Sequence, residues 1–284
     1  MLEAIVHYSF MQHALLAALL SSVACGIMGT VIIEKRLVMM SGGIAHTAFG
    51  GIGLGYYLSI EPMIGALAFS SLSSLGIASL KRNSHTNSDV LMGMFWPLGM
   101  ALGILFISFA PGYPPDMTSY LFGDILTVSR SDLIYMLVLD AIILLTITAY
   151  FNLIVVYLFD EEFGTALGLN MTFIDYLIFF MIGLTVVVII RVIGIILILA
   201  LLCVPPAVAR MYTNNLKKMI LISIGLGVVF CLLGLWISYQ LELASGAAIV
   251  IVSVLAYFLA VGLERIGFGK HRPMTVRESA PSNL

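Results

Sequence analysis

The side chain best placed to do chemistry in this sequence is His46, which lies in a glycine-rich apolar segment, residues 39–55. A polar side chain that can bind metal is costly in lipid, and there it usually marks a path for a substrate. In a helix, the positions four before, three before, four after and seven after His46 share its face. All of these positions are glycine: Gly42, Gly43, Gly50 and Gly53. We therefore expect space in front of the imidazole that an ion or a water molecule could fill.

The same glycines are also typical of tight helix packing. Small residues let two membrane helices approach closely, and Gly51 and Gly55 have the spacing of the common packing motif GxxxG. The sequence leaves both interpretations open: packing alone, or a helix that lines a substrate path at His46.

Asp140 is a second candidate for such a path, near the start of the apolar segment 133–159. A carboxylate inside a membrane helix is costly, and it is a candidate contact for a cation. The alternative is an aspartate that faces outward or pairs with another helix at the membrane interface. The three cysteines lie in apolar stretches without CxxC spacing, so we expect neither a disulfide framework nor a zinc cluster.

The composition places these candidates in a membrane protein. Of the 284 residues, 61% are hydrophobic and only 10% are charged, whereas soluble domains carry about 25% charged residues. The net charge of −2 gives no sign of nucleic-acid binding. The sequence also lacks the Walker A phosphate-binding motif. Transport driven by ATP would therefore need an ATPase in a separate chain.

Nine apolar stretches reach or approach the roughly 20 residues that a helix needs to cross the hydrocarbon core. Two of them, 172–190 and 192–209, are separated only by Arg191, so eight spans remain possible. With nine spans and the N-terminus outside, eleven Lys and Arg residues lie on the inner side and two on the outer side, as the positive-inside rule requires. The other stretches are 11–33, 38–60, 62–80, 90–110, 133–159, 219–241 and 243–263.

The inner segment 160–170 is acidic, although the other inner loops are basic. It begins with three carboxylates, which suit the first turn of a helix because of the helix dipole. Phe163 and Leu167 are four residues apart and share one face, and Gly168 is a typical helix end. A short helix with an apolar ridge could dock on a cytosolic partner. The alternative is an ordinary capped connecting helix.

Pro205 and Pro206 lie near the inner end of the seventh span. They should distort that helix, because proline lacks the backbone N–H that a helix interior needs. A kink there could serve as a hinge or simply end the helix. We expect one membrane domain, residues 1–265, followed by a disordered cytoplasmic tail, 266–284.

Four motifs occur in order along the chain: 40–52 (MSGGIAHTAFGGI), 120–126 (YLFGDIL), 159–169 (FDEEFGTALGL) and 192–210, which is followed by LASGA at 243–247. Together they resemble the permease subunit of bacterial ABC importers for zinc and manganese. The resemblance covers about residues 10–265. It implies an all-α, type II ABC importer-like permease of eight or nine transmembrane helices in the plasma membrane.

The resemblance also implies partners and a cargo. It implies a homodimer with two cytosolic ATPase subunits and an extracellular metal-binding protein, which imports a divalent cation: zinc, manganese or iron. No permanent cofactor and no chemistry in this chain are expected. The segment that would dock on the ATPase contains Asp160, Glu161, Glu162, Phe163, Gly164, Leu167 and Gly168.

The resemblance places His46 on the metal path, but this chain departs from the family pattern at one position. The family commonly carries aspartate where this chain has Gly42, which would put a carboxylate and an imidazole on one helix face. Without that carboxylate we expect weak, passing contact with the metal, because a conduit must release what it binds.

Two other function classes are alternatives to an ABC permease. A secondary, ion-coupled metal transporter would need carboxylates in its spans, and the sequence offers Asp140 and, near an inner end, Asp175. A membrane-embedded enzyme would need a constellation such as HExxH or paired carboxylates, which the sequence lacks.

Overall fold

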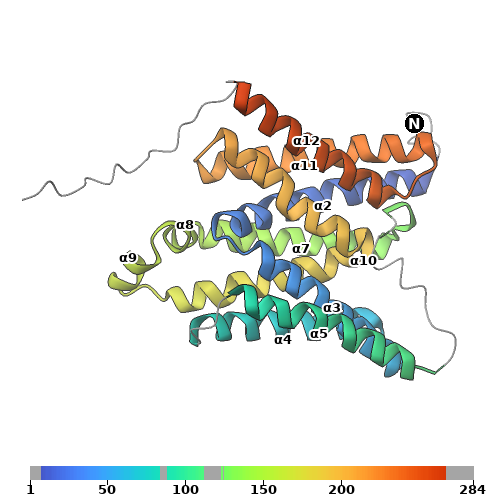
Figure 1. The fold of residues 1–284 in the computed structure, drawn as a ribbon, viewed down its shortest axis with the longest axis horizontal. Coiled ribbons are helices and arrows are strands. Elements are labelled where there is room, and N and C mark those ends of the chain that lie inside the picture. Colours follow the sequence, from blue (N-terminus) through green and yellow to red (C-terminus); the bar gives the residue numbers. More distant parts are fainter. Residues whose placement is uncertain (1–7, 84–87, 112–122, 124, 267–284) are drawn as a thin grey trace, which may run out of the picture.

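The computed structural model describes residues 8–83, 88–111, 123 and 125–266, and its regular structure in these ranges is entirely helical (Figure 1). Most of the expected outer motif 120–126 and the expected tail lie outside the described residues. The elements are α2 (Ser9–Glu34), α3 (Val38–Tyr57), α4 (Pro62–Asn83), α5 (Ser88–Phe109), the 3-10 turn η1 (Ile125–Thr127), α7 (Arg130–Ala149), α8 (Phe151–Phe159), α9 (Glu161–Ala166), α10 (Met171–Tyr212), α11 (Leu216–Leu241) and α12 (Ser245–Ile266).

The helix α10 contains two membrane crossings. Its 42 residues would make a straight helix of roughly 60 Å, about twice the thickness of the hydrocarbon core. The chain leaves helical geometry at Gly194, where φ is 77° and ψ is 168°, a conformation essentially reserved for glycine. The expected break at Arg191 therefore lies three residues too early, because the backbone reverses where a residue without Cβ allows it.

Ion pairs show that α10 returns to the side from which it starts. Near its beginning, Asp175 contacts Arg82, which also contacts Glu161 of α9. At its other end, Arg210 contacts Glu34, next to Lys35, which also binds Glu161. We call this side the α9 end, and Figure 1 shows α10 turning back toward it. It carries the basic residues expected in the cytoplasm.

The opposite side, which we call the Arg191 end, is marked by Arg191 near the reversal of α10. Seven of the described helices are long and apolar enough to cross a membrane. The glycine-rich α3 is not one of these, but it also runs between the two ends, from Lys35 to Glu61. With α3 and with both segments of α10, the described residues make nine crossings, within the expected range.

The glycines of α3 pack against the backbones of α4 and α5. A Cβ at Gly51 would lie 2.6 Å from the carbonyl carbon of Gly65 in α4, and one at Gly50 would lie 3.0 Å from the carbonyl oxygen of Gly99 in α5. Both distances are shorter than ordinary carbon contacts. Gly53 and Gly55 meet Gly103 and Pro62 in the same way. These positions hold three helices in close contact and leave no free space there.

Two other expected features of the spans differ in the structure. The segment 133–159 is divided at Tyr150 into α7 and α8, and α8 leads directly into α9. The helix α10 continues through Pro205 and Pro206 without leaving helical dihedral angles. The departure from helical geometry lies at Gly194, 11 residues before Pro205, so a hinge at the two prolines stays a prediction.

Candidate functional site

His46 stacks on the indole of Trp96, which comes from α5. The ring centroids are 4.2 Å apart with an interplanar angle of 18°. The Nδ1 atom of His46 is buried without a hydrogen-bond partner. The indole also covers Gly42, since a Cβ at that position would lie 3.6 Å from Trp96. The space expected in front of the imidazole is thus occupied by an aromatic side chain.

The neighbouring glycine of the same face is covered as well. A Cβ at Gly43 would lie 2.6 Å from the sulfur of Met92. In sequence, Trp96 and Met92 lie 50 and 46 residues from His46, and no pattern in the chain connects them to it. Helix packing between α3 and α5 brings them together, which is why sequence reasoning missed both.

Asp140 lies in the middle of α7 and is buried, with only 6% of its surface exposed. Neither of its carboxylate oxygens has a hydrogen-bond partner. The helix α7 packs on α2 and α10, whereas α3 packs chiefly on α4 and α5, so the structure does not bring Asp140 and His46 together. Within the described ranges, no three His, Cys, Asp or Glu residues gather in a way that could hold a metal ion.

The helix α9 begins and ends as its sequence leads one to expect. The side chain of Asp160 accepts a hydrogen bond from the backbone N–H of Phe163 at 2.9 Å, which caps the N-terminus. Gly168 has φ of +75° and follows the helix end, as glycine commonly does. Phe163 and Leu167 are 53% and 60% exposed. They form an exposed apolar ridge at the α9 end of the molecule.

Gly164 lies on the inner face of this short helix. A Cβ there would lie 2.8 Å from Val156 and 2.9 Å from Met171, so glycine allows α9 to pack closely on α8 and the start of α10. Glu162 is exposed, whereas Glu161 points back into the protein. The three consecutive carboxylates, which sequence reasoning treated as one group, therefore have three different surroundings.

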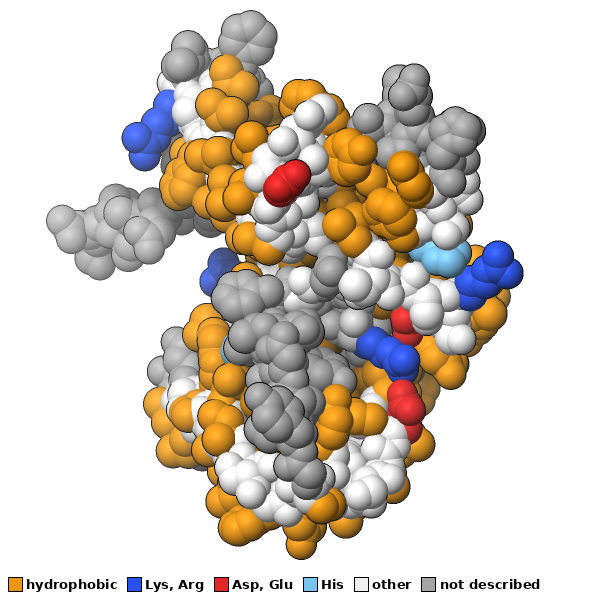
Figure 2. Space-filling view, turned by 90° about the vertical axis from the view of Figure 1, so that its right-hand side faces the viewer, with side chains coloured by type: hydrophobic (Ala, Val, Ile, Leu, Met, Phe, Trp, Pro, Cys, Tyr) orange, Lys and Arg blue, Asp and Glu red, His pale blue; other side chains and the backbone are white. Residues whose placement is uncertain are grey.

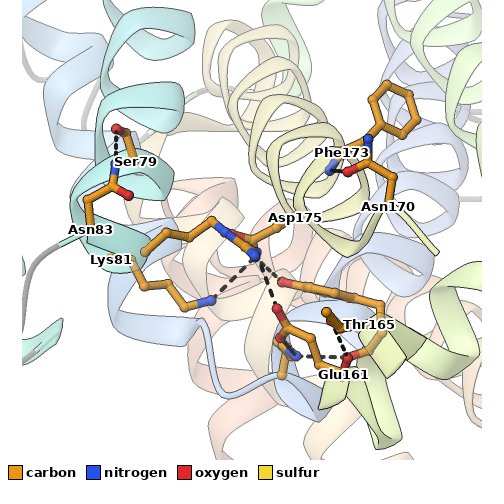
Figure 3. Close-up of polar contacts among 11 residues, drawn as sticks. Ser79, Lys81, Asn83, Glu161, Thr165, Asn170, Phe173 and Asp175 are labelled. Atoms are coloured by element: carbon orange, nitrogen blue, oxygen red, sulfur yellow. Dashed lines mark hydrogen bonds and ion pairs between the residues drawn. The ribbon is translucent and has the colours of Figure 1, made fainter. Parts of the chain in front are cut away.

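Glu161 belongs to a network of charges that joins five elements (Figure 3). Its two oxygens accept from Lys35 at 2.7 Å and from Arg82 at 3.2 Å. Lys35 also donates to the carbonyl of Tyr157 at 2.7 Å, and its ammonium lies 3.9 Å from the ring centroid of Tyr157. Burial raises the pKa of Glu161, but the hydrogen bond and charge of Lys35, with the charge of Arg82, outweigh this effect and lower the pKa below its ordinary value.

Asp175 forms the buried side of the same network. It accepts a short hydrogen bond from the hydroxyl of Tyr157 and pairs with Lys81 at 3.4 Å and with Arg82 at 3.5 Å. Sequence reasoning noted Asp175 only as an acidic residue near an inner end, and it counted Lys35, Lys81 and Arg82 only for orientation. Their pairing could not be inferred, because it depends on how α2, α4 and α10 are placed.

At the Arg191 end, the guanidinium of Arg191 binds two carboxylates. Its Nε lies 2.9 Å from Asp132 and its Nη1 lies 3.0 Å from Glu61. In the sequence, Arg191 marks only the break between two apolar stretches, whereas the structure shows its guanidinium held by these two side chains. Figure 2 faces this end and shows acidic and basic side chains beside each other among apolar surfaces.

Comparisons with known proteins agree with this architecture. The model of the ABC 3 transport family matches residues 7–264. The chain is 41% identical over 268 residues to an uncharacterized membrane protein, slr2045, of Synechocystis, covering 93% of this chain and 95% of that protein. It is 35% identical over 260 residues to the manganese transport system membrane protein MntC of Listeria monocytogenes, covering 91% and 92%.

A solved structure supports the same relation in three dimensions. The structure of PsaBC from Streptococcus pneumoniae in complex with Fab matches with a TM-score of 0.82 and 32% identity. The match covers 91% of this chain and 93% of that one.

Proposed function

The chain belongs to the ABC 3 transport family, and we propose that it is the permease subunit of an importer that carries a divalent transition metal, foremost manganese, into the cell. The proposal rests mainly on the match of nearly the whole chain to permeases, in sequence and in fold. Manganese stands ahead of zinc and iron because relatives in Listeria and Streptococcus gordonii are named for manganese transport.

Two copies of the chain form the transport path, and an extracellular metal-binding protein delivers the ion to it. Manganese prefers several oxygen ligands and zinc prefers four ligands, and one imidazole in each copy supplies neither set. His46 therefore contacts the ion in passing, once Trp96 has moved off its ring. Weak contact suits a conduit, which must release the ion.

Replacing His46 by alanine tests this role. We expect uptake of radioactive manganese to fall at least several-fold in cells that depend on this importer, with the amount of protein in the membrane unchanged. His13, whose ring binds the carbonyl of Val128 at 3.1 Å, provides a matched control as His13→Ala. Unchanged uptake in His46→Ala would remove His46 from the path.

Energy comes from ATP hydrolysis in two separate ATPase subunits, which dock on α9. The exposed apolar ridge of Phe163 and Leu167 supports this assignment, because apolar side chains at a cytosolic surface are typical of a protein contact. The double substitution Phe163→Ala and Leu167→Ala should reduce co-purification of the ATPase. Leu263→Ala, which changes an apolar residue of α12 that is 49% exposed, is the control. Full retention of the ATPase by the double variant would refute docking at this ridge.

The alternative is a secondary metal transporter driven by an ion gradient. Proteoliposomes distinguish the two functions, since an ABC importer needs ATP and its ATPase subunits and continues when ionophores remove the ion gradients. Uptake by the permease alone, abolished by an ionophore, would favour the secondary transporter.

A further inference from the structure

The helix α4 and the first segment of α10, residues 171–193, are joined at both ends. At the α9 end, Asp175 of α10 pairs with Lys81 and Arg82 of α4. At the Arg191 end, Arg191 of α10 pairs at 3.0 Å with Glu61, which directly precedes α4. Ion pairs thus fix the same two segments on both sides of the membrane.

The two segments also contact each other closely in the middle. The hydroxyl of Ser70 donates to the carbonyl oxygen of Gly183 at 2.9 Å. A Cβ at Gly183 would lie 3.0 Å from the Ser70 hydroxyl oxygen and 3.1 Å from that of Ser74, so the helices approach as closely as glycine permits. Small residues and an interhelical hydrogen bond are what hold helices together in lipid.

Besides the packing of Gly164 on Met171, one guanidinium binds α9 to this pair. The Nη1 atom of Arg82 lies 3.2 Å from Glu161 of α9 and 3.5 Å from Asp175 of α10. Glu161 is directed inward, while Phe163 and Leu167 on the same helix are directed outward. Glu161 therefore holds α9 to the membrane helices and leaves contact with a partner to its neighbours.

We propose that α4 and residues 171–193 of α10 move as one rigid lever, which carries a displacement of α9 through the Glu161–Arg82 contact to the Arg191 end. There the lever would move the cluster of Arg191, Glu61 and Asp132, which also anchors the start of α7. The inference rests on the proposed function, since it assumes that an ATPase displaces α9. Arg82 and Glu161 are positioning residues, because they act through other groups and do not contact the metal.

The first experiment measures coupling between ATP hydrolysis and transport. Glu161→Gln keeps the shape of the side chain and removes its charge, and Glu264→Gln makes the same change at an exposed site of α12. In proteoliposomes with the ATPase and the binding protein, we expect Glu161→Gln to retain the ATPase and to hydrolyse ATP. It should transport several-fold less manganese for each ATP, whereas Glu264→Gln should match the parent.

Two results would overturn the lever. An unchanged ratio of manganese to ATP in Glu161→Gln would show that the contact transmits nothing. Loss of the ATPase from this variant would show that Glu161 is a docking residue. A parent protein without ATP-dependent manganese uptake would instead contradict the proposed function, so the two failures are distinguishable.

The second experiment tests rigidity directly with the variant Ser70→Cys, Gly183→Cys. The 3.0 Å between a Cβ at position 183 and the Ser70 oxygen is close to the Cβ-to-sulfur distance across a disulfide, roughly 3 Å. We expect oxidation to form the bond and to leave manganese uptake equal to that of the reduced sample. Uptake blocked by oxidation and restored by reductant would show that the helices must slide, and failure to cross-link would contradict the close packing. The parent chain with its native cysteines is the oxidation control.

Discussion

The substitution Gly65→Ala tests the packing on which the arrangement of α3, α4 and α5 depends. A Cβ at Gly65 would overlap the carbonyl oxygen of Gly51 and lie 3.1 Å from the backbone nitrogen of Gly55. All of these neighbours are backbone atoms, so no side chain can rotate away. To reach ordinary contact distances of about 3.5 Å, α4 must move from α3 by about 1.4 Å.

The cost of this movement can be estimated from the contacts that it disturbs. Overpacking of a close interface costs about 1–3 kcal/mol. Separation also weakens the hydrogen bond of 2.7 Å between Thr47 and Ser73, which is worth about 0.6 kcal/mol inside a membrane bundle. We therefore expect Gly65→Ala to lower the free energy of unfolding by about 2–4 kcal/mol. In a chain of this size, that loss corresponds to a fall in melting temperature of roughly 3–7 °C.

The same helix provides the control for this measurement. Gly76 of α4 has no atom within 4 Å of the position of a Cβ, so Gly76→Ala should be neutral or slightly stabilising through helix propensity. Both variants would be purified in detergent and compared with the parent by thermal unfolding, followed by size-exclusion chromatography. Equal melting temperatures for Gly65→Ala and Gly76→Ala would refute the assignment of the glycines to close packing.

Three further predictions follow from other sites. Gly194→Ala should lower the free energy of unfolding by about 1–3 kcal/mol, because φ of 77° strains any residue with a Cβ; an unchanged melting temperature would contradict the reversal at this residue. Hydrogen exchange should find the amides of α9 protected at neutral pH. Because the pKa of Glu161 is lowered, the charged contact is fully present above the ordinary glutamate pKa of about 4.3 and is lost as the pH falls through the lowered value. The protection factor, which corrects for the slower intrinsic exchange at low pH, should therefore fall only below about pH 4, and loss of protection already at pH 6 would contradict this attachment. Gly42→Asp should destabilise the protein, because the carboxylate meets Trp96, and Trp96→Ala in the same chain should relieve this effect and give stabilisation by manganese in a thermal assay. Equal stability of the single and double variants would show that Trp96 does not occupy the space.

Hydropathy and basic residues were sufficient to predict most of the membrane architecture. Apolar stretches of the required length predict spans because lipid offers no hydrogen-bond partner to a bare backbone. The helix break was less predictable, since it depends on backbone geometry. Arg191 interrupts the hydropathy, but the guanidinium can be held at the membrane surface by Glu61 and Asp132 without a break in the helix. The backbone reverses at Gly194, which the hydropathy profile does not distinguish from its neighbours.

The candidate site was predictable only where its residues are local in sequence. The helix α9 follows from a capping residue, an apolar pair and a terminal glycine within ten residues, all of which interact along one chain segment. The partners of Glu161 are Lys35, which directly follows α2, and Arg82 of α4. In the sequence, these basic residues indicated only which side of the membrane their loops face. A single sequence contains no information that separates a basic residue facing solvent from one paired with a distant carboxylate.

The surroundings of His46 connect two features that look independent in the sequence. The family resemblance leads one to expect a carboxylate at position 42, and the chain has glycine there, beside the ring of Trp96 at 3.6 Å from the position of a Cβ. A Cβ at position 42 would already touch the indole, so a carboxylate extending from it toward His46 would compete with Trp96 for space, which connects the missing carboxylate with the stacked tryptophan. The stack is worth about 0.5–1.5 kcal/mol, which is small enough for thermal motion to open it. On the transport path proposed above, access of the metal to His46 would therefore depend on the movement of the Trp96 ring rather than on the strength of a ligand pair.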